Sequence, residues 1–149
     1  MANNHKIFWI TTAIVFSFIL LSFIPMFFHK GTLLHNLEKE VDNISFPASV
    51  EKVAIKSDIG DSGGNGQYST LRVVMAVKTD LDKNALKDTI EKMNLRFPKH
   101  YSTNNNVPIF YVTHCNGTEF ASSRDFTLKF DELSAVNDYS NFYFIEFVE

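Results

Sequence analysis

The sequence has little of several residue types on which whole classes of protein depend. It contains one cysteine in 149 residues, which excludes a disulfide framework within one chain and a metal site built from several thiolates. It also lacks an excess of basic residues, since 14 Lys and Arg stand against 17 Asp and Glu, for a net charge of −3. Nucleic-acid-binding domains are usually strongly basic, so we expect no nucleic-acid partner.

Charge is missing altogether from residues 7–28, which read IFWITTAIVFSFILLSFIPMFF. A membrane-spanning helix needs about 20 apolar residues to cross a hydrocarbon core about 30 Å thick. Pro25 and Phe28 stand where a cleaved signal peptide would carry small residues. We therefore expect a signal-anchor helix over 7–28 in the lipid bilayer of the cell membrane. We expect a single-pass arrangement, with the tail 1–6 inside and the rest of the chain outside.

The region after the expected span divides into a linker over 29–48 and an extracytoplasmic domain over 49–149. Leu34, Leu37 and Val41 recur at a spacing of three and four residues, which predicts a short amphipathic helix. Such a helix packs either on its own domain or against a second chain, and barely one heptad is present. The length left for the domain is enough for one modest core.

The domain carries strand patterns that alternate with one helix pattern. Apolar and polar residues alternate over 53–59 and again over 68–79, and the glycine-rich segment between them predicts a long antiparallel hairpin. A helix is expected from 82 to about 94, capped by Asp80 or Asp82. Further strands are expected over the following ranges: 107–115, 126–130 and 142–148. We therefore predict an α+β fold in ββαβ(β)β order. After the membrane helix comes a mostly antiparallel sheet of about four to five strands, packed against one helix.

The last expected strand, 142–148, is apolar on both faces. A central strand covered on both sides explains this composition. An edge strand of the same composition would instead invite pairing with another chain, which is an aggregation hazard. The central position is therefore favoured.

The segment Gly60-Asp61-Ser62-Gly63-Gly64 is similar to the GDSGG segment around the nucleophile of trypsin-like serine proteases, and Thr113-His114-Cys115 is similar to their His-Cys step. The resemblance implies a hydrolase in which Ser62 is activated by a histidine. The order differs, because the histidine precedes the serine in that family, and the two β-barrels of that family need a longer chain. We interpret the segment as a hairpin loop and expect no catalytic residue.

The same loop offers oxygen atoms and exposed backbone amides. We name Asp58, Asp61, Ser62 and Asn65 as candidate binding residues of this loop. The spacing fits neither an EF-hand nor a phosphate-binding loop, and the five histidines form no metal-ligand pattern, so no metal and no cofactor are expected. Cys115 is expected to be a buried thiol rather than a nucleophile.

These observations favour a membrane-anchored, non-catalytic interaction protein that binds an unidentified protein partner. An accessory subunit of an envelope complex and a toxin-immunity-type protein both fit this description, and a homo-oligomer stays open. A ligand or ion sensor that uses the Gly60–Gly66 loop is the alternative, and a hydrolase that uses Ser62 is a third hypothesis. The sequence names no substrate.

Overall fold

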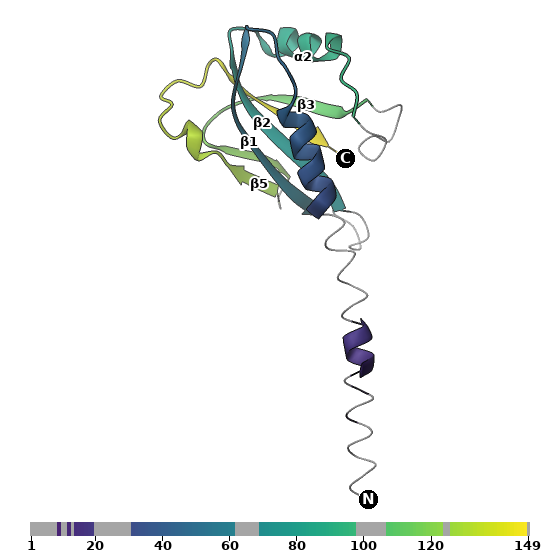
Figure 1. Ribbon diagram of the computed structural model, residues 1–149. Helices are drawn as coiled ribbons and strands as arrows, with labels where there is room; N and C mark the ends of the chain where they lie inside the picture. The colour runs from purple at the N-terminus through teal and green to yellow at the C-terminus, as the bar shows by residue number, and fades with distance from the viewer. Residues whose placement is uncertain are drawn as a thin grey trace, which may run out of the picture. The chain divides into compact units, whose positions relative to one another are not determined.

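The computed structural model describes Trp9, Thr12 and residues 14–19, 31–61, 69–97, 107–123 and 126–148. The chain divides into two compact units, Met1–Leu33 and Leu34–Glu149. Residues 31–42 are helical. The later elements are β1 (Val50–Asp61), β2 (Ser69–Thr79), α2 (Lys83–Lys92), β3 (Ile109–His114), β4 (Glu119–Ser123), β5 (Phe126–Lys129), the 3-10 helix η2 (Asp131–Leu133) and β6 (Phe142–Val148) (Figure 1).

The first unit corrects the membrane prediction. Among the described residues, no helix is both long enough and apolar enough to cross a membrane. The helical residues 14–19 rise about 9 Å at about 1.5 Å per residue, against the 30 Å or so of a hydrocarbon core. On this finding the predicted transmembrane helix over 7–28 is wrong, and so is the single-pass cell-membrane localisation that depended on it. The other residues of 7–28, and the tail 1–6, lie outside the described residues.

The second unit is built on a four-stranded antiparallel sheet in the order β1-β2-β6-β3. The alternation along the first two strands forms the expected hairpin, with Ile55 opposite Met75 and Lys56 opposite Val74. β6 lies between β2 and β3, and its residues 142–147 are all buried. The central position predicted from its apolar composition is confirmed, because neighbouring layers cover both of its faces.

One face of the sheet is covered by helix. Ser57, Met75 and Ile145 share this face, and the Ser57 hydroxyl donates a hydrogen bond to Glu38 Oε2 at 3.1 Å. The helical residues 34–42 therefore lie on this face. Three apolar side chains of the segment and the turn after it are buried: Leu37, Val41 and Ile44. The three-and-four spacing thus belongs to a helix that packs on its own domain.

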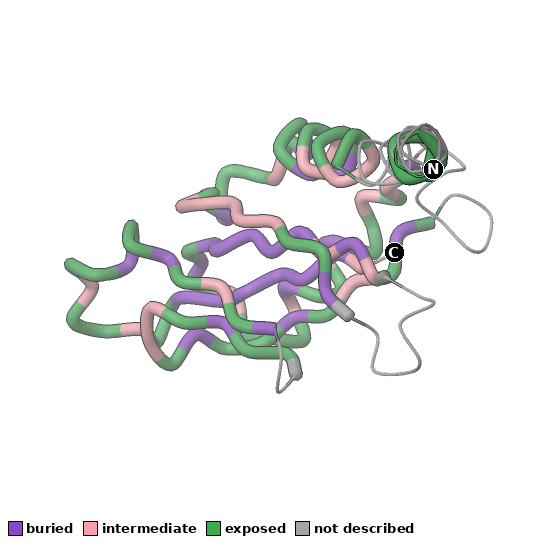
Figure 2. Tube along the Cα trace, turned by 90° about the horizontal axis from the view of Figure 1, so that it is seen from below, coloured by how far each residue is buried: buried purple, intermediate pink, exposed green. Residues whose placement is uncertain are grey.

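The opposite face is covered by the β4-β5 hairpin and η2. Nine buried residues form one cluster here: Val74, Ala76, Cys115, Phe120, Phe126, Phe130, Leu133, Phe142 and Phe144. The Phe144 ring is the centre of this cluster, with ring centroids at 5.3 Å from Phe120 and 5.0 Å from Phe130. Burying a Phe side chain contributes about 1.5–3 kcal/mol, so this cluster is a main source of stability. Figure 2 shows the buried stretches running along the strands, between more exposed outer segments.

The fold class predicted from the sequence is wrong as a whole, because it began with a transmembrane helix. The four-stranded antiparallel sheet fits only the domain part of that prediction. Within the domain, β4 and β5 form a separate two-stranded sheet instead of joining the main one. Two helical segments, 34–42 and α2, accompany the main sheet instead of one. Strand length and alternation do not encode which sheet a hairpin joins, so this difference was not visible in the sequence.

Candidate protein-binding edge

β3 forms one edge of the main sheet. Among the described residues, its only strand partner is β6, to which it is antiparallel from Ile109 to His114. An edge strand directs every second set of backbone N–H and C=O groups away from its sheet. These groups can pair with an added strand, so the β3 edge can accept an extended segment of another chain.

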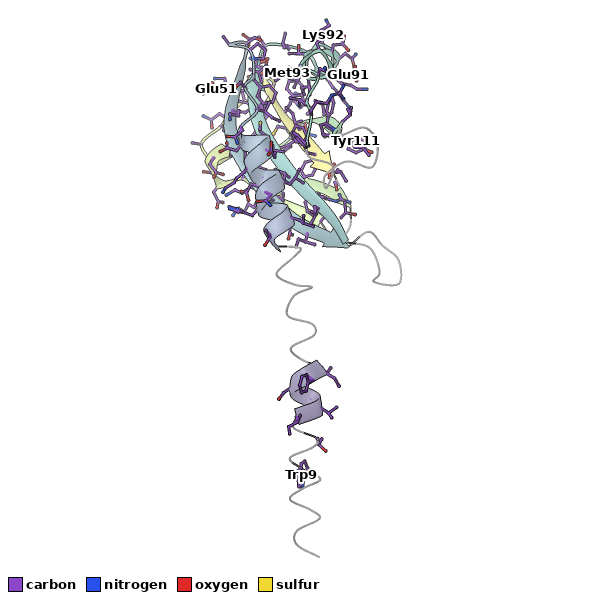
Figure 3. The ribbon with its side chains drawn as sticks, turned by 45° about the vertical axis from the view of Figure 1, so that its right-hand side comes forward. Trp9, Glu51, Glu91, Lys92, Met93 and Tyr111 are labelled. Atoms are coloured by element: carbon purple, nitrogen blue, oxygen red, sulfur yellow. The ribbon has the colours of Figure 1, made fainter. Side chains whose placement is uncertain are left out.

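The side chains along β3 alternate between packed and exposed. Phe110 and Val112 face the helix-covered side, where the Phe110 ring lies 6.2 Å from the Phe147 ring and Val112 is buried. Ile109 and Tyr111 point to the other side and are 47% and 56% exposed. Figure 3 shows Tyr111 on the β3 side of the unit, away from Glu51 in β1. The β4-β5 hairpin does not cover these two apolar side chains, and exposed apolar groups that lie together are typical of interaction sites.

The opposite edge of the sheet, β1, is built differently. It carries Lys52 and Lys56, and the strand has a bulge between Lys52 and Ala54. Lys52 pairs with Asp42 at 3.5 Å and Lys56 with Glu132 at 3.3 Å. Lysines and bulges are the usual protection of an edge against pairing with another chain. β3 has neither, so of the two edges only β3 is suited to receive a strand.

The end of β3 is anchored to the first residue of β6 and to the turn that precedes it. The Cys115 backbone N–H donates to Phe142 O at 2.9 Å, and His114 Nε2 lies 3.1 Å from Ser140 O. A carbonyl oxygen only accepts, so Nε2 carries the hydrogen of this bond. The His114 ring also meets Tyr143 edge-on, with centroids 5.1 Å apart. These contacts hold the strand in its extended form, which lowers the entropy lost when a partner binds.

Glu146, which belongs to a buried ion pair, lies beside the exposed side chain of Tyr111. Glu146 is opposite Tyr111 in the register, and its Oε1 is 3.0 Å from Arg72 Nη1, with side-chain exposures of 8% and 16%. The guanidinium also contacts the Ser122 hydroxyl and lies 4.8 Å from the Phe126 ring centroid. Arg72 Nε is buried without a hydrogen-bond partner. Arg72 of β2 thus ties the β4-β5 hairpin to the main sheet, and its partner Glu146 of β6 lies beside the β3 edge.

The loop residues named from the sequence are only partly described. Asp58 is exposed, lies opposite Arg72, and accepts a hydrogen bond from the Ile59 backbone N–H at 2.7 Å. Asp61 lies opposite Ser69 at the end of the hairpin. Ser62 and Asn65 lie outside the described residues, so the four-residue binding site stays a prediction. Within the described part of the chain, no cluster of His, Cys, Asp and Glu could hold a metal. The sensor and hydrolase hypotheses stay predictions.

Cys115 is buried in the cluster under the β4-β5 hairpin. Burial raises the pKa of its thiol from 9.0 to about 12, because the apolar surroundings disfavour the thiolate. The thiol is protonated at neutral pH and is a poor nucleophile there.

A groove of about 540 Å³ runs between the helical residues 35–42 and β1 residues 52–55. Its walls carry Glu38 and Asp42 against Lys39 and Lys52. The two signs are balanced, and the Lys52–Asp42 pair joins the two walls. The groove therefore shows no preference for an anion or a cation.

No family model, curated protein or solved structure matches this chain. The sequence predicted β3 as a strand but missed that it is an edge, because Ile109 and Tyr111 look no more exposed in the sequence than Phe110 and Val112. The absence of any charge from 107 to 114 pointed the other way, because edge strands usually carry protective charges.

Proposed function

We propose that the unit Leu34–Glu149 is a non-catalytic protein-binding module, and that it binds by adding an extended segment of a partner protein to the edge of β3. The observation that carries the proposal is the pair of apolar side chains on an unprotected edge, Ile109 at 47% and Tyr111 at 56% exposure. Backbone hydrogen bonds supply affinity in this mode, and alternate side chains supply selectivity.

Two further features support the proposal. The strand is held in its binding conformation by the contacts of His114 and Cys115 described above. The neighbouring charges of Arg72 and Glu146 pair with each other within the sheet, so a partner strand does not have to neutralise a charge there. A partner strand without charged residues fits this edge best.

Photo-crosslinking tests the proposal. A chain with benzoylphenylalanine in place of Tyr111 is expressed in the producing cells and irradiated, and the same residue is placed at Thr127 as a control. Thr127 is an exposed position of β5, away from the proposed edge. We expect crosslinked products from position 111 and not from position 127. Equal labelling at both positions, or none at position 111, would show that β3 is not the binding edge.

A second variant separates binding from accidental proximity. Thr113 shares the exposed side of β3 with Tyr111. Thr113→Lys places on β3 the kind of charge that protects β1, and it should abolish the crosslink from position 111. Thr127→Lys should leave the crosslink unchanged. Persistence of the crosslink in Thr113→Lys would contradict strand addition.

A further inference from the structure

The geometry points to a second copy of this chain as the partner at the β3 edge, with the two β3 strands antiparallel about a two-fold axis. The two four-stranded sheets would then join into one of eight strands. This inference rests on the proposed function, since it names the partner of the same edge. Three features of the strand carry it.

The first feature is charge. In a two-fold antiparallel pair, each residue lies opposite a residue of the same segment, so a charged strand meets its own sign. Residues 107–114 carry no Asp, Glu, Lys or Arg, and self-pairing therefore opposes no like charges. The same pairing at β1 would bring Lys52 and Lys56 toward their own copies, and β1 is the edge that is bulged and occupied by ion pairs.

The second feature is the placement of the exposed side chains. Rotation about a two-fold axis perpendicular to the sheet leaves the hairpin-covered faces of both copies on the same side of the joined sheet. Ile109 and Tyr111 of both copies therefore meet on that side. With the axis at Phe110, Ile109 lies opposite Tyr111 of the second copy, and the reverse contact is made as well. Aromatic residues opposite β-branched ones are among the favourable cross-strand pairs. Both side chains are about half exposed in the single chain, and both would lose water in the pair.

The third feature is the neighbouring sheet. β6 already pairs with β3 along its whole length, from Ile109 opposite Val148 to His114 opposite Tyr143. The strand is thus extended and in register before a partner arrives. β3 has 6 residues, far fewer than the roughly 20–30 residues a side in a standard complex, so the interface is small. We therefore expect a concentration-dependent dimer rather than an obligate one.

Sedimentation velocity on the full chain tests this inference over a concentration series from about 1 μM to several hundred μM, a range that spans weak association. The species present should shift from 17.0 kDa toward twice that mass as concentration rises. Tyr111→Lys and Tyr111→Glu should each weaken the association by about tenfold or more, because a like charge then faces its copy across the axis. Thr127→Lys is the matched control and should dimerise like the native chain. All variants keep the same N-terminal residues, so any association through those residues would persist in every sample.

The decisive sample is a mixture of Tyr111→Lys with Tyr111→Glu. The two positions 111 lie opposite or diagonal to each other whether the axis passes through residue 110, 111 or 112, so the opposite charges attract. Dimer should return in the mixture at concentrations at which each variant alone is monomeric. A monomer at all concentrations, undiminished dimer in both single variants, or no recovery in the mixture would overturn the inference. Crosslinking of position 111 to a different protein under those conditions would leave the proposed function standing.

Discussion

Removing the carboxylate of Glu146 should destabilise the fold much more than removing any exposed charge. In Glu146→Ala the Arg72 guanidinium loses its partner at 3.0 Å while its side chain stays only 16% exposed. Breaking a buried pair from one side typically costs about 3–5 kcal/mol. Arg72 keeps the Ser122 hydroxyl and the Phe126 ring as neighbours. We therefore expect the lower end, a loss of about 3 kcal/mol in the free energy of unfolding.

The assay is urea unfolding of the full chain, followed by circular dichroism, with the midpoint and slope fitted separately. Two controls accompany it. Lys129→Ala removes an exposed pair, Lys129–Asp131 at 3.5 Å with 66% and 75% exposure, and should change stability by less than about 1 kcal/mol. The double variant Arg72→Met, Glu146→Leu replaces the buried pair with apolar groups and should recover most of the lost stability.

The reasoning fails in either of two cases. If the free energy of unfolding of Glu146→Ala lies within about 1 kcal/mol of the native value, the pair behaves like an exposed one and not like a buried one. If the double variant is as unstable as the single one, the loss comes from packing and not from an uncompensated charge.

Three further predictions concern a thiol, a helix cap and a glycine. The free energy of unfolding should fall as pH rises from about 9 toward 12, because over this range Cys115 keeps its proton in the folded chain, where its pKa is about 12, and loses it in the unfolded chain. This dependence on pH should vanish in Cys115→Val, and an equal dependence there would contradict the assignment. Asp82→Ala should cost about 1 kcal/mol in thermal unfolding, because Asp82 caps α2, and Asp82→Ser should restore most of it. Gly60→Ala should lower the free energy of unfolding by about 1 kcal/mol, because a Cβ there lies 3.3 Å from Nε of Arg72, whose guanidinium is fixed by Glu146 and Ser122. If Gly60→Ala costs as much in an Arg72→Met background, this explanation is refuted.

Local patterns predicted the parts of the fold that depend on neighbours in sequence. The alternation of Val73, Met75 and Val77 identified β2, and the glycine-rich segment before it identified the hairpin with β1. Asp82 was one of the two residues named as the helix cap, and it accepts hydrogen bonds from the Asn84 and Ala85 backbone N–H groups. In these cases the sequence pattern and the structure arise from the same few residues.

Features that depend on distant parts of the chain were not predictable in this way. Arg72 and Glu146 are 74 positions apart, and each alone reads as an exposed charge on a strand. The edge position of β3 follows from the strand order, which no local pattern records. The membrane prediction rests on apolar composition alone, and among the described residues no helix is both long and apolar enough to cross a membrane.

The place of β6 has a consequence for how the chain is made. β6 lies between β2 and β3 in the sheet, yet it follows every other described strand in the chain. On the ribosome, β2 and β3 are both complete while the strand that joins them is still untranslated. The sheet can therefore close only after residues 142–148 have been made, and until then β2 and β3 lack the strand that lies between them and can pair with other chains.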